Sequence, residues 1–483
     1  MADLRADAAF RRSINTQKGP CGTTRVETDS LGSREIPGEA YWGINVLRAL
    51  ENFAISGRPI ATYPDLIFGY ACVKQAAARA NAEIGVLAAD KAALIDRVCE
   101  EIKDGQLHDQ FVVDIMQGGA GTSTNMNVNE VIANRGLELA GFPKGSYEHL
   151  HPNDHVNRSQ STNDTYPTAL KVGLGLAIER LLAELKQLED AFRAKGREFA
   201  RIVKVGRTQL QDAVPMTLGQ EFEGFAVTLA DDRASFERVF VELGEINLGA
   251  TAIGTGITAD QRYAAAVQKH LAAITGFPIV TASNLIEATT DVGVFMELSG
   301  VLKRNAMKLS KICNDLRLLS SGPQAGFGEI NLPPRQAGSS IMPGKVNPVI
   351  PEVVNEVAFI VAGGDVTLAM AAEAGQLQLN AFEPVMAHVL FENLKWMTAA
   401  MTTLRENCVL GITANQERLA KQVASFVGVI TALIPEIGYE AAAKLAKEAL
   451  STNANIADLV VSSGQITREK VTELLSPERL TSN

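Results

Sequence analysis

The chain has little of what marks secreted, membrane-spanning or nucleic-acid-binding proteins. Its five cysteines are scattered and include no Cys-x-x-Cys pair, which argues against a disulfide framework or a zinc site. No apolar run approaches the roughly 18 residues that a bilayer-spanning helix needs. The formal net charge is −10 without a block of basic residues, so nucleic acid and anionic membranes are disfavoured as partners. These absences predict a protein of a reducing compartment, with the cytoplasm as the default.

The N-terminal segment also lacks the apolar core that a signal peptide needs. It contains Asp3 and Asp7, and acidic residues are rare in transit peptides. Residues 1–20 are therefore predicted to form a flexible leader.

Long helical patterns dominate the chain from about residue 165 to about residue 410. Apolar side chains recur every three or four residues in 174–192 and 302–319, and every seven in 222–243. Each stretch predicts a helix with one apolar stripe. Because several such segments run for about 25 residues, the fold is predicted to be mostly α, with a central bundle of long helices. The opposite faces carry many Ala, Val and Gly residues, which favours oligomerisation through the bundle.

The length of the chain exceeds one ordinary core and predicts two or three domains behind the leader. We expect an N-terminal domain over 21–160, a central helical-bundle domain over 161–410 and a small C-terminal helical domain over 411–483. Within the last of these, Thr467 is predicted to start a helix.

Polar residues gather at four places where a helix is expected to begin. The first is "QGGAGTSTNMNVNE" at 117–130, where Gly118, Gly119 and Gly121 let the backbone turn tightly and approach a ligand. Thr122 and the three polar residues after it then offer hydroxyl and amide donors. No Lys-Ser/Thr pair follows, so this is not a P-loop. A helix start with a polar first turn remains the simpler interpretation of this motif alone.

The second place is "NRSQSTNDTYPT" at 157–168. Ser161, Thr162, Asn163 and Asp164 are all good N-cap residues, although capping needs only one of them. A ligand role and a Ser/Thr-rich helix start are equally compatible with the motif.

The third place is "GRTQLQDAVPMTLGQEF" at 206–222, which leads into a long helix. Thr217 and Gln220 have the spacing of a capping box. Capping does not explain Thr208 and Gln209, which belong either to a ligand site or to a solvated loop.

The fourth place is "GSSIMPGKVNP" at 338–348. Asn347 and Pro348 are predicted to be the N-cap and first residue of the next helix. Lys345 then precedes a helix N-terminus, where the dipole favours anions, so a cation is sensible there if an anion binds between the two. An exposed lysine in a turn is the alternative.

If the four loops converge, they form a site with many neutral donors and one lysine, without a grip for a cofactor. Such a site suits a small dianionic or zwitterionic acid, with Lys345 and Asn347 at one carboxylate and the hydroxyls at the other. When a proton leaves the adjacent carbon, charge flows into a carboxylate that preorganised donors stabilise. Ser339 could take that proton as an alkoxide if backbone N–H groups and Lys345 lie nearby. Gly338 and Gly344 would supply the mobility of a closing lid.

"GSSIMPGKVNP" resembles the signature of the aspartase/fumarase superfamily. Six further segments resemble this superfamily in order and spacing, over roughly residues 24–430: "GGAGTSTNMNVNE", "NDHVNRSQSTND", "GRTQLQDAVPMTLGQEF", "LGATAIGTG", "SKICNDLRLLSSGP" and "AAEAGQLQLN". The resemblance implies a mostly helical three-domain subunit with a central bundle of long helices. It also implies a homotetramer in which loops of three subunits build each active site.

Site residues carry over by position. Ser339 matches the catalytic base on the mobile loop of the family, and Lys345 and Asn347 match the groups at the substrate α-carboxylate. The donors around the β-carboxylate match Thr122, Ser161, Thr162 and Thr208, and the contact to the amino group matches Asn163. Position in the family, rather than the sequence itself, separates Ser339 from its neighbour Ser340.

The choice within the superfamily depends on Gln209, which stands where fumarases and some aspartases carry a histidine. Glu352 matches the acid that partners this histidine in fumarases, so its role here is open. Hydration of fumarate needs an acid–base group that handles water, whereas deamination releases an ammonium group that is already protonated. Glutamine can form hydrogen bonds without titrating. We therefore expect a carbon–nitrogen lyase of the aspartase type, which converts L-aspartate to fumarate and ammonia, with fumarate hydration to L-malate as the alternative.

The resemblance implies no required cofactor and leaves activation by a divalent cation such as Mg²⁺ open. Argininosuccinate and adenylosuccinate lyases share the signature loop, but their other motifs do not match. A non-catalytic protein on the same scaffold is disfavoured because the serine, the lysine and the Ser-Thr-Asn run are present. The segment "HLHPNDH" resembles a second anion site of fumarases at His151, Asn153 and Asp154, with a metal site or a structural loop as alternatives.

Overall fold

The computed structural model of this chain describes residues 23–452 and 454–481, so the predicted leader lies outside the described residues. The chain packs as two compact units that are each built from three stretches of sequence. Unit 1 comprises residues up to 180, 236–302 and 363–395, and unit 2 comprises 181–235, 303–362 and 396 onward. The predicted domain boundaries near 160 and 410 stay predictions.

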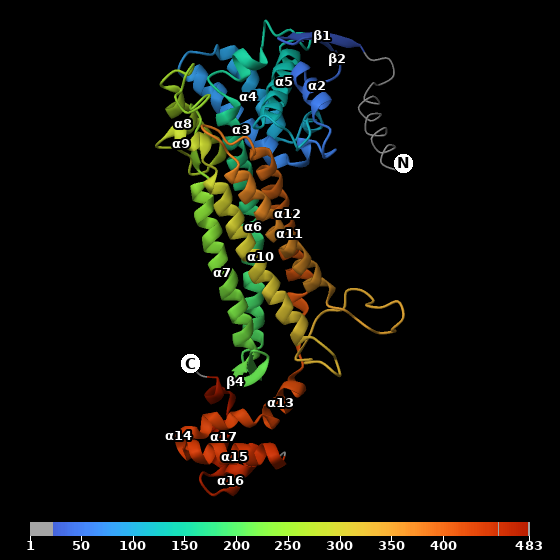
Figure 1. The fold of residues 1–483 in the computed structure, drawn as a ribbon, viewed down its shortest axis with the longest axis vertical. Coiled ribbons are helices and arrows are strands. Elements are labelled where there is room, and N and C mark those ends of the chain that lie inside the picture. The colour runs from blue at the N-terminus through green and yellow to red at the C-terminus, as the bar shows by residue number, and fades with distance from the viewer. Residues whose placement is uncertain (1–22, 453, 482–483) are drawn as a thin grey trace. The chain divides into compact units, whose positions relative to one another are not determined.

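Long helices carry the chain through both units (Figure 1). Among the described residues, five helices reach 25 residues or more: α6 (Thr162–Glu198), α7 (Leu218–Glu242), α10 (Gly293–Leu319), α11 (Val349–Glu373) and α12 (Glu383–Asn407). The stripe predicted over 174–192 is buried at every apolar position that defined it, from Leu174 to Phe192. The prediction of a bundle of long helices is therefore confirmed.

Unit 1 is built around α3 (Pro64–Glu83), which packs against three other helices (Figure 1). Its neighbours are α4 (Ala89–Lys103), α5 (Thr122–Leu139) and α8 (Tyr263–Thr275). Pro64 occupies the first turn of α3, where its missing N–H costs nothing. Because Ala and other small residues fill most of its length, α3 is buried on several sides and forms the core of this unit.

The remaining elements of unit 1 are short. They are β1 (Thr24–Asp29), β2 (Gly32–Pro37), α2 (Ile44–Asn52), η1 (Ile60–Thr62), η2 (His108–Gln110), η3 (Pro152–Val156), β5 (Glu245–Ile246), β6 (Val280–Thr281) and α9 (Leu285–Thr290). The strands β1 and β2 form an antiparallel hairpin, and β5 pairs with β6 in parallel.

Unit 2 ends in a group of short helices with an apolar core of its own. The elements after α12 are η4 (Val409–Gly411), β8 (Thr413–Ala414), α13 (Gln416–Ser425), η5 (Val427–Leu433), α14 (Ile434–Ile437), α15 (Tyr439–Thr452), α16 (Ile456–Ser462), α17 (Arg468–Leu474) and α18 (Pro477–Leu480). Thr467 caps α17 by accepting a hydrogen bond from the Lys470 amide, which confirms the predicted helix start. The short strand β8 pairs with β7 (Ile330–Asn331).

The segment described from sequence as a loop leading into a long helix is a β-hairpin instead. Strands β3 (Val203–Thr208) and β4 (Gln211–Thr217) pair antiparallel, with one register shift between Val205 and Arg207. The predicted capping box at its end is confirmed, because Thr217 and Gln220 each accept from the other's backbone N–H at 3.0 and 2.9 Å.

Helix α11 corrects the expectation that no segment could span a membrane. Among the described residues it is the one single helix that is long and apolar enough by length and composition, and only 28% of its most apolar window is buried; the pair Gln416–Ser425 and Val427–Ile437, bent by 69°, meets the same criteria only when counted as one span. This test is weak for a single helix, since helices that pack in bundles pass it as well. Helix α11 thus keeps exposed apolar side chains such as Phe359 and Met370.

Candidate active site

The first two polar loops meet in unit 1, at the N-termini of α5 and α6. We call residues 117–125 and 157–164 the unit 1 loops. Gly121 precedes α5 with φ of 83°, and a Cβ there would lie 1.9 Å from the ring of Tyr166. Only glycine fits this position, and it brings the start of α5 close to α6. Ala120 and Ser159 also have positive φ, which is strained for non-glycine residues and concentrates at functional sites.

The start of α6 is a capping box that uses two of its four polar residues. The Ser161 hydroxyl accepts from the Asn163 amide at 3.2 Å, and Asp164 Oδ1 accepts from the Ser161 amide at 2.9 Å. Asp164 is fully buried, and its other oxygen accepts from the backbone N–H groups of Gly249 and Thr251. Burial raises the pKa of Asp164 to about 7, and these hydrogen bonds oppose that rise. Asp164 thus ties the "LGATAIGTG" segment to the start of α6.

Asn163 is oriented by that same segment. Its Nδ2 donates to the Ala252 carbonyl at 2.7 Å, which fixes the amide with Oδ1 on the other side. Among the described residues, Oδ1 accepts no hydrogen bond. The Oδ1 atom is thus available to accept a hydrogen bond from a ligand, and the contact to an amino group expected of Asn163 stays a prediction.

Thr122 is exposed at the first residue of α5, and its hydroxyl donates to the Gly119 carbonyl at 2.7 Å. A threonine hydroxyl has a single proton, so Thr122 must rotate away from Gly119 before it can donate to a carboxylate. Thr162 differs, because its hydroxyl accepts from Asn125 Nδ2 at 3.2 Å and keeps its proton for another acceptor. Thr162 is therefore the better prepared donor of the two.

The third polar loop is the tip of the β3–β4 hairpin in unit 2. Thr208 pairs with Gln211, and the two turn residues Gln209 and Leu210 have φ of 53° and 62°. A two-residue turn with both φ values positive is ordinarily built from Asn and Gly. Gln209 and Leu210 hold it at a steric cost, which presents the exposed Thr208 and Gln209 side chains at the tip.

A buried ion cluster anchors this hairpin. Glu329, which has no exposed surface, accepts from Arg207 at 2.5 Å and lies 2.7 Å from Lys204. Lys204 is also nearly buried and pairs with Glu221 at the start of α7. Because breaking a buried ion pair leaves an uncompensated charge, this cluster fixes the hairpin to its unit.

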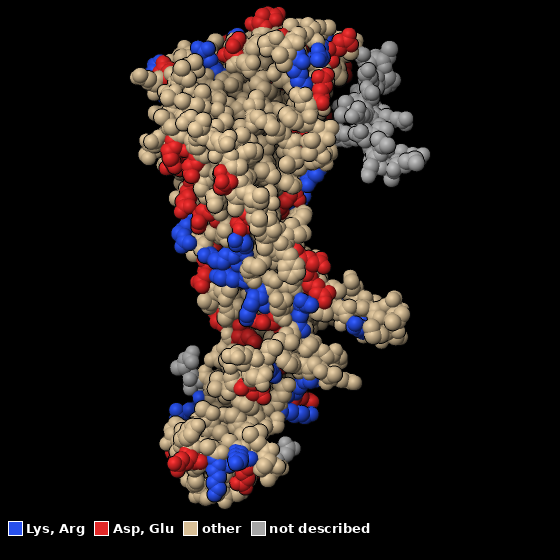
Figure 2. Space-filling model, viewed as in Figure 1, with Lys and Arg blue, Asp and Glu red and all other residues tan. Residues whose placement is uncertain are grey.

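The fourth polar loop extends away from the helices, and its two ends lie next to each other. We call residues 338–347 the Ser339 loop. Two hydrogen bonds join the ends of this loop. The backbone N–H of Gly338 donates to the Lys345 carbonyl at 2.7 Å, and Asn347 Nδ2 donates to the Gly338 carbonyl at 2.8 Å. In the space-filling view few charged side chains lie on the protruding segment that contains it (Figure 2).

One sequence expectation fails where the two ends of this loop meet, and another stays a prediction. Asn347 is not the N-cap of α11. The helix begins at Val349, and the Asn347 side-chain amide donates to the Gly338 carbonyl instead. A Cβ on Gly338 would lie 2.8 Å from the Asn347 nitrogen and the Lys345 oxygen, so close approach by itself requires glycine there, and the mobility expected of Gly338 stays a prediction. Gly344, with φ of 78° and open space around it, remains a flexible position.

Ser339 is distinguished from Ser340 by its surroundings. Its Oγ accepts hydrogen bonds from the backbone N–H groups of Met342 at 2.9 Å and Ile341 at 3.2 Å. Donors of this kind stabilise an oxyanion, which is what a serine needs to act as a base. The Ser340 side chain makes no hydrogen bond among the described residues, and it is exposed.

Lys345 lines the same cavity of about 450 Å³ as Ser339. Its side chain is exposed, and among the described residues it has no ion-pair or hydrogen-bond partner. A lysine without a partner among the described residues is available to an anionic ligand, and the role predicted for Lys345 stays a prediction.

The structure thus groups the candidate residues by unit. Thr122, Ser161, Thr162 and Asn163 lie together in unit 1. Ser339, Lys345 and Asn347 share one loop of unit 2, and Thr208 and Gln209 share the hairpin tip of that unit. Sequence reasoning missed Lys74, which is buried behind the unit 1 loops and donates to Asn125, Asn157 and Gln160. Its only signal was a lysine within a long run of small and apolar residues.

The histidine segment forms most of its side-chain hydrogen bonds within itself. His151 Nδ1 accepts from the amides of Asn153 and Asp154, and the His151 amide donates to His155 Nδ1. Lys91 Nζ lies 2.9 Å from His155 Nε2. These contacts fit the structural-loop interpretation of this segment.

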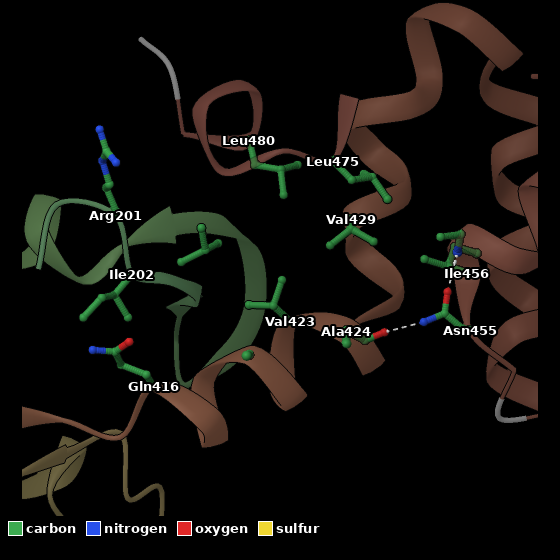
Figure 3. A pocket seen from close by; sticks show the side chains of 13 residues that line it. Arg201, Ile202, Gln416, Val423, Ala424, Val429, Asn455, Ile456, Leu475 and Leu480 are labelled. Atoms are coloured by element: carbon green, nitrogen blue, oxygen red, sulfur yellow. Dashed lines mark hydrogen bonds between the residues drawn. The ribbon is translucent and has the colours of Figure 1, made fainter. Parts of the chain in front are cut away.

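A cavity of about 440 Å³ in unit 2 contains none of the candidate residues. It lies between the start of β3, α13 and the C-terminal helices, and its walls include Val423, Val429 and Ile456 (Figure 3). The polar Asn455 beside it is satisfied by the Ala424 carbonyl and by the amides that it caps. Its lining is mixed, because Arg201 and Gln416 lie beside the aliphatic side chains.

Family models match most of the chain. One described as "Lyase" matches residues 32–363, and one described as "Fumarase C C-terminus" matches residues 429–482. Aspartate ammonia-lyase of Pseudomonas aeruginosa is 55% identical over 95% of this chain and 98% of its own length. Those of Helicobacter pylori J99 and Escherichia coli K12 are 53% and 50% identical over 95% and 94% of this chain, and over 98% and 96% of their own lengths.

Solved structures agree with these relatives. A fumarate lyase:delta crystallin from Brucella melitensis, bound to cobalt, has a TM-score of 0.93 and 52% identity, covering 95% of this chain and 100% of the other. A class II fumarase from Schistosoma mansoni has a TM-score of 0.90 and 32% identity, covering 95% and 99%. The chain therefore belongs to the aspartase/fumarase superfamily of lyases.

Proposed function

We propose that this chain is an aspartate ammonia-lyase, which converts L-aspartate reversibly to fumarate and ammonia. The observation that carries this proposal is the similarity of 50–56% identity to curated aspartate ammonia-lyases over nearly the whole chain. The intact Ser339, Lys345 and Ser161-Thr162-Asn163 run supports it, because a chain that had lost the activity need not keep them.

Ser339 is proposed as the base that removes the Cβ proton. Its Oγ already receives two backbone N–H groups, which would stabilise the alkoxide form. As the C–H bond breaks, its electron pair moves into the adjacent β-carboxylate and forms an aci-carboxylate dianion. The unit 1 hydroxyls would stabilise this charge more strongly than that of the ground state, which is how donors accelerate a reaction.

The second step expels ammonia. The dianion re-forms the carboxylate and a carbon–carbon double bond while the carbon–nitrogen electron pair leaves with nitrogen. Asn163 Oδ1 would hold the ammonium group before it departs. Lys345 would bind the α-carboxylate through a charge-assisted hydrogen bond.

Gln209 supports deamination over hydration. The leaving ammonium group carries its proton already, so no acid of matched pKa is needed beside it. Hydration of fumarate requires a titrating group to activate water, and glutamine does not titrate. Fumarate hydration therefore remains the second candidate.

We further propose that the chain forms a homotetramer in which three subunits share each active site. The support is the exposed apolar surface of α11, which includes Phe359 at 63% and Met370 at 68% exposure. Exposed apolar surface of this extent on one helix marks an interface. A bundle formed by α11 of several subunits would cover it.

No cofactor is needed for this chemistry, because the base and the charge-stabilising donors are all protein groups. We propose that a divalent cation such as Mg²⁺ acts at most as an activator. Dialysis against a chelator should leave turnover in place, and its complete loss would contradict this. The cytoplasmic location stays a prediction.

Absorbance at 240 nm tests the proposed function directly. L-aspartate and L-malate are offered separately to the purified protein, and fumarate formation is followed. The proposal predicts fumarate from aspartate. Fumarate from malate but not from aspartate would replace it with hydration.

A further inference from the structure

Lys74 lies in the middle of α3 with no exposed surface. Its Nζ donates to three side-chain oxygens: Asn125 Oδ1 at 2.7 Å, Asn157 Oδ1 at 2.8 Å and Gln160 Oε1 at 2.9 Å. Burial lowers the pKa of Lys74 to about 7, and the nearby Asp164 opposes that shift. Three oxygen acceptors require three N–H groups, and only the protonated ammonium has three. The geometry therefore holds Lys74 in its charged form.

An ammonium can only donate, so it decides how the surrounding amides are turned. Asn125 Oδ1 faces Lys74 and lies 3.2 Å from the Thr165 hydroxyl, whose proton has a nearer acceptor in the Ser161 carbonyl at 2.9 Å. Its Nδ2 must then point the other way, where it donates to Asn157 Oδ1 at 3.1 Å and to the Thr162 hydroxyl at 3.2 Å. Asn157 Oδ1 collects donors from Lys74, Asn125 and Asn129, so its orientation is equally determined.

The direction of donation along these hydrogen bonds decides whether the Thr162 hydroxyl can donate its proton to a ligand. Because Thr162 Oγ1 accepts from Asn125, its single proton is left to donate elsewhere. Among the described residues it donates to no acceptor, and the side chain is half-buried at the start of α6. If the Asn125 amide were reversed, its oxygen would take the Thr162 proton and remove a donor from the pocket.

We propose that Lys74 is a positioning residue for the deamination, because its ammonium sets the direction of the Lys74–Asn125–Thr162 hydrogen-bond chain so that Thr162 donates to the substrate β-carboxylate. This inference rests on the proposed function. The Thr162 donor is worth most when the carboxylate becomes a dianion, so reversing the chain lowers kcat more than it raises KM. Lys74 itself touches no substrate and acts through Asn125.

A double-mutant cycle tests this direction. Asn125→Asp keeps the side-chain shape and pairs with Lys74, but it can only accept and so captures the Thr162 proton. We expect a loss of about 10- to 100-fold in kcat/KM, mostly in kcat. In a Thr162→Val background that proton is already absent, so Asn125→Asp should cost several-fold less than in the wild-type background, and the cost that remains comes from the lost hydrogen bond to Asn157 Oδ1. Equal losses in both backgrounds, or near-normal activity of Asn125→Asp, would overturn the inference.

Lys74→Met supplies a second cycle with the same expectation, and the thermal midpoint and the elution volume of each variant report folding. Succinate, a dicarboxylate that cannot react, separates this inference from the proposed function. Calorimetric titration should show that Asn125→Asp weakens succinate binding more in the wild-type background than in Thr162→Val. Equal weakening in both backgrounds would refute the chain direction. A wild-type protein that forms no fumarate from aspartate would refute the proposed function, while the succinate cycle still decides the role of Lys74.

Discussion

The unit 1 loops and the Ser339 loop both carry candidate substrate ligands, but they are built in opposite ways. The unit 1 loops are tied by buried groups such as Lys74 and Asp164, which between them engage side-chain amides and backbone N–H groups of three segments. The Ser339 loop is mostly exposed. Among the described residues, its two ends are joined to each other by hydrogen bonds and not to a buried group. The difference suggests that substrate binding is preorganised in one region, whereas the proton-transfer group sits on a segment that can move.

The largest effect should come from the base. Ser339→Ala removes the alkoxide and should lower kcat by about 10²- to 10⁴-fold, while dicarboxylate binding by the unit 1 loops persists. Steady-state turnover measures the fall in kcat, and succinate titration measures the dicarboxylate binding that persists. Ser340→Ala, the matched control in the same loop, should stay within a few-fold of wild type. Near-normal turnover of Ser339→Ala would remove the base from the Ser339 loop.

The next effect tests the lysine of the same loop. Lys345→Ala removes a charge-assisted hydrogen bond to the α-carboxylate, worth about 1.5–3 kcal/mol, so kcat/KM should fall by roughly 10- to 100-fold. Both KM and kcat are expected to change. Lys421→Ala, an exposed lysine of α13, controls for the change in net charge. An unchanged KM for Lys345→Ala would argue against the anion role.

The pH dependence of stability should come from unit 1, where burial raises the pKa of Glu383 to about 8. The folded chain keeps this proton at pH values where the unfolded chain has lost it. The contribution of Glu383 to stability is therefore complete below its ordinary pKa of 4.5 and is lost as the pH rises through about 8.

Glu383→Gln keeps the neutral shape and should remove this dependence, at most about 1.4 kcal/mol per pH unit. Thermal midpoints measured between about pH 5 and pH 8 should fall less steeply for this variant. Glu448→Gln, at an exposed position on α15, should leave the slope unchanged. Parallel slopes for Glu383→Gln and wild type would place the titrating group elsewhere.

The smallest effect is expected at the hairpin tip. Gln209→His restores the fumarase-type residue, but Thr208 and the unusual turn that presents it stay unchanged. Activity with aspartate should change by less than roughly tenfold, since one hydrogen bond between neutral groups is worth only about 1 kcal/mol. Appearance of fumarate hydration as the main activity would show that Gln209 alone sets the reaction.

Sequence alone predicted the long helices, because apolar spacing along 174–192 reports directly on burial. It did not predict the β3–β4 hairpin, since Gln209 and Leu210 are not residues that ordinarily form such a turn. The unit 1 ligands were identified by resemblance, but the buried Lys74 behind them was not. Its partners lie 51 to 86 residues away in the chain, and no local pattern reports such contacts.

In the proposed homotetramer, the unit 1 loops and the Ser339 loop of different subunits complete one active site. Co-expression of Ser339→Ala with Thr162→Val tests it, because each subunit then lacks one half of the site. Random assembly should restore roughly a quarter of the sites if the halves come from different subunits. The account predicts fumarate formation from aspartate at up to that level, far above either variant alone. Mixed tetramers that are no more active than the two variants would show that each site is built from one chain, and would contradict the account.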